Sequence, residues 1–129
     1  MNGTERINRL TDTIIASAIK VHTKLGPELL EHAYVKCLAY ELEKTGLKVA
    51  SEMPLSLEYE QLVVDAAYRI DILVEDAVIV EIKAVEKVLP VHHAQLLTYL
   101  KLFNKRVGLL LNFNVRILPN GIKRMVNNL

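Results

Sequence analysis

Two carboxylates and a lysine interrupt a strongly apolar stretch, residues 68–85 (YRIDILVEDAVIVEIKAV). Asp71 lies in its first half, and Glu81 and Lys83 lie in its second half. Carboxylates are the hard oxygen ligands that Mg²⁺ and Mn²⁺ prefer. A lysine beside them is able to orient a water molecule or to neutralise charge on a phosphate. These residue types are therefore suited to metal-assisted hydrolysis of a phosphodiester.

The same stretch predicts a β-hairpin, because two apolar, β-branched runs flank the acidic pair Glu75-Asp76. Side chains on a strand alternate between its two faces. Alternation puts Asp71 on one face of the first strand and puts Ile70, Ile72 and Val74 on the other. It also puts the acid and the lysine of the second strand on one face. Pairing of the strands is thus expected to bring the three charged side chains together.

A simpler explanation of these charges is a cross-strand ion pair on a solvated sheet face, worth at most ~1 kcal/mol. Arg69 is expected to pair with one of the acids rather than to bind phosphate. If the site is real, Asp71 and Glu81 repel each other without a cation, so the pKa of at least one should rise. The backbone carbonyl of Ile82 is then a further candidate metal ligand.

Composition limits the classes of protein to which the chain can belong. With 129 residues, of which 51% are hydrophobic and 24% charged, it fits one folded domain over residues 1–129. No apolar run approaches the ~20 residues of a membrane span, and the polar start MNGTERINR is unlike a signal peptide. The single cysteine, Cys37, excludes an intramolecular disulfide and a cysteine zinc site. It fits the reducing cytoplasm and a small core position on a helix.

The N-terminal part of the chain predicts two helices. Residues 4–25 carry an apolar stripe at three- and four-residue steps. Thr4 is expected to cap this helix, and Gly26-Pro27 is expected to end it. A second helix is expected over residues 28–44, before a terminating glycine.

Glu31 is the unusual residue of the second helix, because it lies in line with the apolar Val35, Leu38 and Leu42. Two interpretations remain open from spacing alone. Glu31 is either a solvated acid in the first turn, where the helix dipole favours it, or a carboxylate directed at the sheet that joins the acids of the hairpin.

The period of the apolar residues changes to two after the second helix. Residues 48–59 predict one or two strands interrupted near Pro54, and residues 61–64 lead into the hairpin. A third helix (90–103) begins at a proline, and strands are expected at 106–113 and, after Asn120-Gly121, at 122–126. This order predicts an α/β fold, an α+β sandwich with a mixed sheet flanked by helices.

The third helix carries polar side chains beside its apolar face. Gln95 and Tyr99 lie one turn apart. The adjacent His92 and His93 are expected to be solvated residues at a helix start rather than metal ligands. Tyr99 and Tyr34 fit equally well as core tyrosines with hydrogen-bonded hydroxyl groups.

The formal net charge is only +1, so nucleic-acid binding requires a local basic patch. Five basic residues towards the C-terminus are candidates for a phosphate-binding rim: Lys101, Lys105, Arg106, Lys123 and Arg124. A scattered, solvated surface explains them equally simply. If the rim exists, binding should weaken steeply with salt.

Asp71 followed by Glu81-Ile82-Lys83 resembles the signature of the PD-(D/E)xK nuclease superfamily. The nearer match within it is the small GxxExxY family. The resemblance covers four segments in the same order: ELLEHAY (28–34), residues 68–85, HAQLLTYLK (93–101) and the tail from VGLLLNF through NGIKRMVNN. One position departs from the pattern, because the glycine that names the family is Glu28 here, whereas Glu31 and Tyr34 are kept.

The resemblance implies a restriction-endonuclease-like core and metal-dependent cleavage of nucleic acid, DNA more than RNA. It implies that Asp71 and Glu81 bind Mg²⁺ or Mn²⁺ and that Glu31 completes or orients the metal site. Lys83 would position the water molecule or stabilise charge.

Gln95 and Tyr99 resemble the QxxxY element of some nucleases in this superfamily, which lies near metal-bound water or a phosphate. The runner-up function is a catalytically weak or inactive nuclease-fold module that binds nucleic acid or a protein partner. The complete set of two acids and a lysine favours the enzyme. Because so small a chain has little room to grip a duplex, a homodimer or an unidentified partner is expected.

Overall fold

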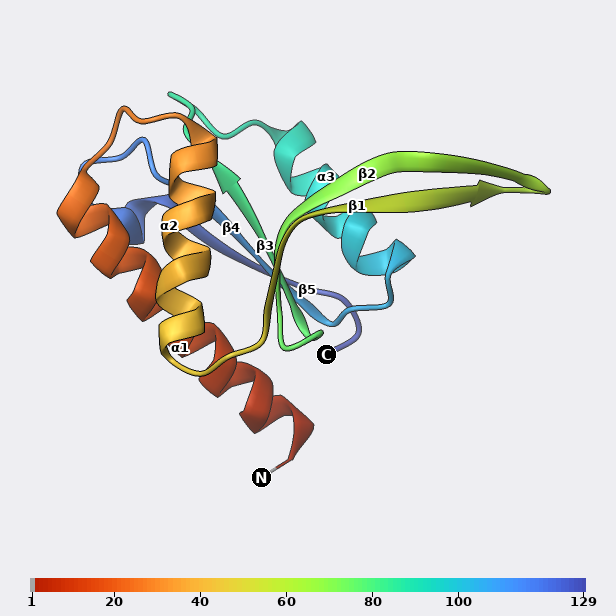
Figure 1. Ribbon diagram of the computed structural model, residues 1–129, viewed down its shortest axis with the longest axis horizontal. Coiled ribbons are helices and arrows are strands. Elements are labelled where there is room, and N and C mark those ends of the chain that lie inside the picture. The colour runs from red at the N-terminus through yellow and green to blue at the C-terminus, as the bar shows by residue number, and fades with distance from the viewer. Residues whose placement is uncertain (1) are drawn as a thin grey trace.

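The computed structural model describes residues 2–129, which form one five-stranded sheet with helices on both faces (Figure 1). In chain order the elements are α1 (Gly3–Leu25), α2 (Glu31–Lys44), β1 (Val49–Tyr59), β2 (Leu62–Val74), β3 (Val78–Lys83), α3 (Pro90–Leu102), β4 (Val107–Asn112), the 3-10 turn η1 (Leu118–Gly121) and β5 (Ile122–Val126).

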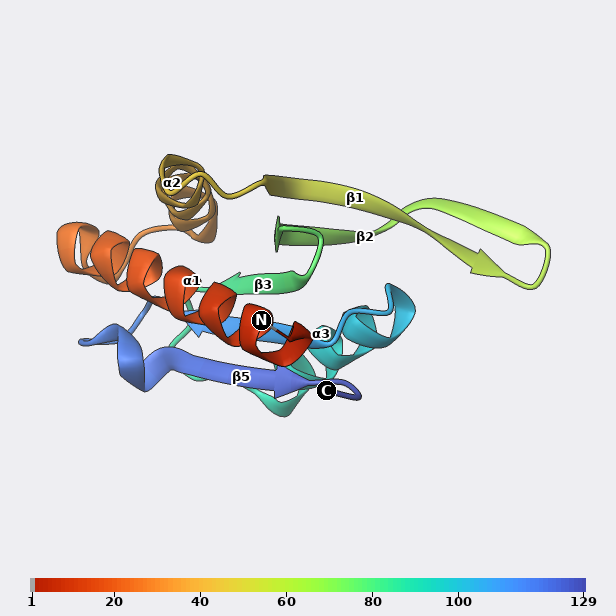
Figure 2. The ribbon, with the colours of Figure 1, turned by 90° about the horizontal axis from the view of Figure 1, so that it is seen from below.

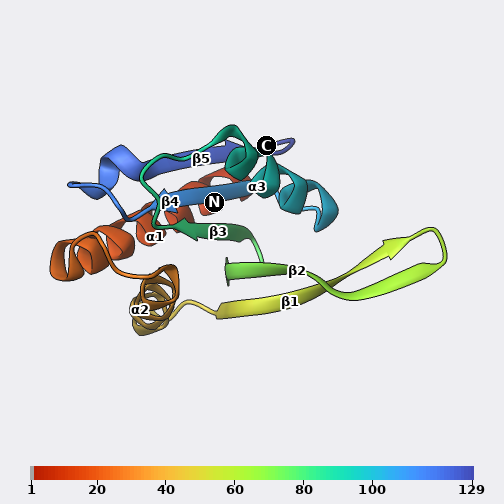
Figure 3. The same cartoon turned by 90° about the horizontal axis from the view of Figure 1, so that it is seen from above.

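The strands lie in the order β1-β2-β3-β4-β5, which can be followed in Figure 3. Strands β3 and β4 are parallel and the other neighbouring pairs are antiparallel. A parallel pair needs a long crossover connection, and α3 supplies it. The predicted α+β architecture with a mixed sheet flanked by helices is therefore confirmed.

The two faces of the sheet bury separate apolar cores. Helices α1 and α2 cover one face, where they pack against alternate side chains of β2, β3 and β4. Helix α3 covers the other face and packs against the intervening side chains. Cys37 lies partly buried on α2 against the first core, as expected for a small core residue. Among residues 2–129, no helix is both long enough and apolar enough to cross a membrane.

Two of the predicted helix starts are wrong. Helix α1 is capped by Asn2, whose Oδ1 accepts a hydrogen bond from the Glu5 N–H at 2.8 Å, and not by Thr4. Helix α2 begins at Glu31 rather than Glu28. The φ of Glu28 is 78°, a left-handed conformation that cannot belong to a right-handed helix.

Simple alternation along β2 is also wrong at one point. Ile72 and Val74 face α1 and α2, but Ile70 packs with Leu73 in the core beneath α3. The pairing of β2 with β3 runs from Val74 back only to Ile72. Asp71 therefore lies where the strand leaves its ladder and changes the face that its side chains present.

The outer parts of β1 and β2 form a projecting arm, residues 56–67, that extends beyond the rest of the fold (Figures 1 and 2). Residues 58–67 are all exposed. The register pairs Leu57 with Val64 and Tyr59 with Leu62, so these four side chains share one face of the arm. The arm begins at an irregularity between Leu55 and Leu57.

Candidate active site

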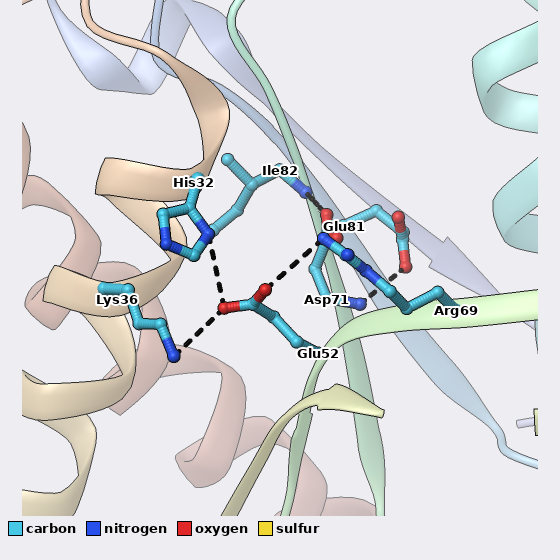
Figure 4. Close-up of polar contacts among 7 residues, drawn as sticks. All are labelled: His32, Lys36, Glu52, Arg69, Asp71, Glu81 and Ile82. Carbon is cyan, nitrogen blue, oxygen red and sulfur yellow. Dashed lines mark hydrogen bonds and ion pairs between the residues drawn. The ribbon is translucent and has the colours of Figure 1, made fainter. Parts of the chain in front are cut away.

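Asp71 and Glu81 meet in the gap where β2 and β3 separate. The Asp71 N–H donates to Glu81 Oε1 at 3.3 Å, and the Ile82 N–H donates to Asp71 Oδ2 at 2.8 Å (Figure 4). Each carboxylate thus binds a backbone N–H of the opposite strand, at a position where the backbone ladder has ended. The predicted convergence of these two acids is present, although a break in the strand produces it rather than a continuous pleat.

The acids are held in a setting that disfavours two negative charges. Burial and the neighbouring Asp71 charge raise the pKa of Glu81 to about 8. Burial also raises the pKa of Asp71, against the opposing effect of the Ile82 N–H. The charge of Lys83 lowers the pKa of both carboxyl groups but does not cancel these effects. A cation placed between the acids would relieve their repulsion.

Lys83 ends β3 beside Asn112, its register partner in β4. The Asn112 side chain clamps the next part of the chain, because its Nδ2 donates to the Val85 carbonyl at 2.9 Å and its Oδ1 accepts from the Val85 N–H at 3.1 Å. Asn112 is buried and positions the segment that follows Lys83. Sequence reasoning missed this residue, although an amide within the apolar run 106–113 was a visible signal.

Glu31 lies at the first turn of α2 and is directed at the end of β3. Its Oε2 accepts a hydrogen bond from the Ala84 N–H at 3.3 Å, and its charge raises the pKa of Asp71. The side chain is therefore not a purely solvated helix-start acid. Within residues 2–129, however, no three His, Cys, Asp or Glu side chains are close enough together to hold a metal ion.

Tyr34 fixes the loop from which Glu31 emerges. Its hydroxyl donates to the Gly26 carbonyl and accepts from the Leu29 N–H at 3.2 Å. Its buried ring stacks on Phe113 with 4.4 Å between ring centroids. The interpretation of Tyr34 as a core tyrosine with a hydrogen-bonded hydroxyl is confirmed.

Tyr99 lies on α3 in the core that this helix forms with β2 and β3. Burial raises the pKa of the Tyr99 hydroxyl, and the charges of Glu81 and Asp71 raise it further, whereas the neighbouring Gln95 side chain lowers it. The hydroxyl therefore stays protonated and is available as a donor. Gln95 is exposed, whereas Tyr99 is buried. The Tyr99 ring packs edge-on against the Tyr68 ring, with 5.6 Å between the ring centroids.

Two of the five residues of the candidate basic rim have partners away from the acids. Lys105 forms an ion pair with Asp76 at 2.9 Å, in the turn before β3 and so at the far end of that strand from Lys83. Arg124 donates instead to Asn8 at 2.9 Å. At the start of α3, the His92 ring accepts a hydrogen bond from the Leu89 N–H, so it caps the helix.

Arg69 does not pair with either acid, and the prediction that it would is wrong. It forms an ion pair of 3.5 Å with Glu52 of β1. The same carboxylate lies 3.1 Å from Lys36 Nζ and 3.4 Å from His32 Nδ1, both on α2 (Figure 4). Lys36 above all, with His32 and Arg69, lowers the pKa of Glu52. Sequence reasoning missed this cluster, because nothing in the spacing of its members links them.

The arrangement around β3 fits a hard divalent cation. Its donors are carboxylate oxygens, which suit Mg²⁺ or Mn²⁺. Burial raises the pKa of Glu81 and of Asp71, and the Asp71 charge raises that of Glu81 further, so the gap disfavours two carboxylate charges unless a cation balances them. Two acids that meet in one gap, with a lysine two residues beyond one of them, are suited to hydrolysis at a phosphate.

Comparison with known proteins assigns the family. A family model described as the PD-(D/E)XK nuclease superfamily matches residues 8–125. Searches of curated proteins and of solved structures gave no match. The matched region holds both strands of the acidic gap, together with Lys83 and Tyr99. The chain therefore belongs to the PD-(D/E)XK nuclease superfamily.

Proposed function

We propose that the protein is a metal-dependent nuclease that hydrolyses phosphodiester bonds of nucleic acid, in DNA more than in RNA. The observation that carries this proposal is the meeting of Asp71 and Glu81 in the gap between β2 and β3, with Lys83 beside them. A purely structural ion pair would lower the pKa of its acids, whereas burial and mutual repulsion raise it here.

Asp71, Glu81, the Ile82 carbonyl and Glu31 are the proposed ligands of Mg²⁺ or Mn²⁺. The bound ion supplies Lewis-acid polarisation of the phosphate and a more acidic water molecule. Because Glu31 hydrogen-bonds to the Ala84 N–H, it holds the end of β3 in place for the other ligands. Glu81, whose pKa of about 8 favours the neutral acid at neutral pH, would hold the ion as its carboxylate.

Lys83, Tyr99 and Gln95 act on the substrate in this mechanism. The Lys83 ammonium orients the attacking water molecule and balances charge that develops on the phosphoryl oxygens. The protonated Tyr99 hydroxyl, with Gln95 one helical turn away, donates to a phosphate oxygen. Asn112 takes no direct part and keeps the segment after Lys83 in position through Val85.

Membership of the GxxExxY family is part of the same proposal. Glu31 and Tyr34, the two kept residues of that pattern, have connected roles at the loop before α2. The departing residue, Glu28, has a φ of 78°, which a glycine adopts without strain. The glycine of the pattern thus has a physical reason, which is the sharp turn into α2.

The runner-up, a catalytically weak module that binds nucleic acid or a protein, is favoured by one observation. No preformed group of three His, Cys, Asp or Glu ligands is present among the residues that the structure describes. A homodimer or an unidentified protein partner remains a prediction for either function.

The test is incubation of the purified chain with single-stranded DNA, double-stranded DNA and RNA in Mn²⁺ or Mg²⁺. Asp71→Ala and Lys83→Ala are assayed beside it, with Lys87→Ala as a control that removes an exposed lysine. Cleavage by the wild type and the control, but by neither site variant, supports the nuclease. Equal products from all four preparations indicate a contaminant and overturn the proposal.

A further inference from the structure

Three basic side chains converge on the carboxylate of Glu52, which lies half-buried on β1. His32 and Lys36 come from one face of α2, and Arg69 comes from β2. The three basic side chains are 62%, 59% and 58% exposed, whereas that of Glu52 is 20% exposed. The three basic groups are thus open to an anion from solvent, and the Glu52 carboxylate holds them together.

This cluster borders the proposed catalytic carboxylates. Arg69 precedes Asp71 by two residues on β2, and Glu52 lies across from Asp71, between the residue pairs that join β1 to β2. His32 directly follows Glu31. Figure 4 shows the Glu52 cluster beside Asp71 and Glu81. A nucleic acid strand with one phosphate at the acidic gap would bring a neighbouring phosphate towards these cations.

Glu52 is held less well than its ion pairs suggest. Its φ of 51° is a left-handed conformation, which is unfavourable for a residue with a side chain. Its buried Oε1 has no aligned hydrogen-bond partner, although Lys36 Nζ lies 3.1 Å away. Ion pairs with partly exposed cations contribute little to stability. Stability alone therefore gives a weak reason for this arrangement.

We propose that His32, Lys36 and Arg69 form a binding subsite for a backbone phosphate that flanks the scissile one, and that Glu52 occupies it until nucleic acid binds. A guanidinium group binds phosphate through paired N–H donors, and an ammonium group adds a point charge. The Glu52 carboxylate is an anion in the same place, so it competes with the phosphate. The subsite also supplies local positive charge to a chain whose net charge is only +1. The inference rests on the proposed function.

Glu41 provides a matched control for Glu52. It is a carboxylate with 18% side-chain exposure that forms ion pairs with Lys20 at 2.9 Å and Lys44 at 3.4 Å. Both acids thus lie among cations with similar exposure, but Glu41 bonds to cations of α1 and α2 and takes no part in the acidic gap. Glu41→Gln and Glu52→Gln change net charge equally, so a difference between them reports position.

The test measures binding of fluorescent single- and double-stranded DNA oligonucleotides by anisotropy, in EDTA to prevent cleavage, over a range of salt concentrations. Glu52→Gln should tighten binding roughly three- to tenfold, the effect of removing one nearby like charge. Glu41→Gln should change it less than about twofold. Lys36→Ala and Arg69→Ala should each weaken binding and reduce the slope of log K against log salt by about one, because each removes one cation that neutralises a phosphate. Thermal unfolding of every variant checks that it is folded.

The outcomes separate this subsite from the nuclease itself. Equal affinities of Glu52→Gln and Glu41→Gln overturn the subsite, even if the wild type cleaves DNA in Mn²⁺. A lower melting temperature of Glu52→Gln with unchanged affinity means that the cluster only fastens α2 to the sheet, and it also overturns the subsite. Tighter binding by Glu52→Gln with no cleavage by any chain supports the subsite and overturns the proposal that the protein is a nuclease. An absence of binding by every chain in EDTA overturns the subsite, and cleavage in Mn²⁺ decides the nuclease separately.

Discussion

Glu81 and Glu52 are the same residue type in one sheet, yet their surroundings have opposite electrostatic effects. Burial and the charge of Asp71 raise the pKa of Glu81 to about 8. Lys36 and its basic neighbours lower the pKa of Glu52. The difference arises from what each neighbouring element supplies, because α2 brings cations to β1, whereas the break in β2 brings a second acid to β3.

This contrast distinguishes an acid surrounded by basic groups from two acids that repel each other. Glu52 gains favourable interactions when charged, whereas Asp71 and Glu81 together disfavour the charged state. Local instability of this kind is typical of a site that awaits a ligand. The experiments below either separate the two environments further or show that they are equivalent.

The largest expected difference is in catalysis. Asp71→Asn should reduce the rate of hydrolysis at least ~100-fold, because it removes a proposed metal ligand with little change in shape. Glu52→Gln should keep the rate within about tenfold of the wild type, because Glu52 binds no metal in this mechanism. Initial rates on a labelled DNA substrate in Mn²⁺ measure both. Similar reductions in the two variants would remove the distinction between the acids.

Stability should depend on pH in opposite directions at the two acids. The folded-state pKa of Glu81 is about 8 against an ordinary value of 4.5. Its contribution to the free energy of unfolding is therefore fully present below about pH 4.5 and is lost as the pH rises to about 8. Glu52, whose pKa is lowered from 4.5, contributes above that value and loses its contribution as the pH falls.

Urea unfolding of the metal-free chain between pH 4 and 9 measures these contributions. Glu81→Gln should flatten the decline above pH 4.5, and Glu52→Gln should flatten the decline on the acidic side. The larger effect, up to a few kcal/mol, is expected for Glu81, because it is the more deeply buried acid. A decline between pH 5 and 8 that persists in Glu81→Gln would assign it to another group.

Metal binding should stabilise the chain only through the acidic gap. Mn²⁺ at about ten times its Kd adds ~1.4 kcal/mol of stability and raises the melting temperature by several degrees. The shift should persist in Glu41→Gln and Glu52→Gln and disappear in Asp71→Asn. Calorimetry with and without millimolar Mn²⁺ measures it. No shift in the wild type would count against a metal site at these residues.

The smallest effect concerns two glutamates with left-handed backbone conformations. Glu28→Gly should raise the free energy of unfolding by ~1 kcal/mol, because glycine adopts the φ of 78° without strain. Glu52→Gly should gain less or lose stability, because it removes three ion pairs as well. Urea midpoints measure both. An equal gain in the two variants would show that the cations around Glu52 contribute nothing to folding.

The sequence was informative where a pattern depends on local periodicity. The apolar spacing located α1, α3 and β4, and the hairpin pattern brought Asp71 to Glu81. The predicted face of Ile70 was wrong, because alternation assumes an unbroken pleat. Near Ile70 the hydrogen bonds of the two carboxylates replace the backbone ladder. The start of α2 was also misplaced, since a helical pattern does not reveal that Glu28 has a positive φ.

Contacts between distant elements were beyond the sequence. Glu52 meets His32 and Lys36 only because α2 packs beside β1, and no spacing rule connects these residues. The same limitation explains the wrong partner predicted for Arg69. The importance of Glu31 and Tyr34 was easier to predict, because both lie in the segment ELLEHAY (28–34) of the family resemblance.

The arm formed by residues 56–67 has a consequence for how this protein can diversify. Met53, Leu55 and Tyr68, which lie just outside the arm where it joins the sheet, pack against the core beneath α3. Residues 58–67 are exposed, so their identity is under little constraint from packing. Substitutions there can change what the molecule touches while the acidic gap keeps its geometry. The protein thus combines a rigid platform with an appendage that is free to evolve separately.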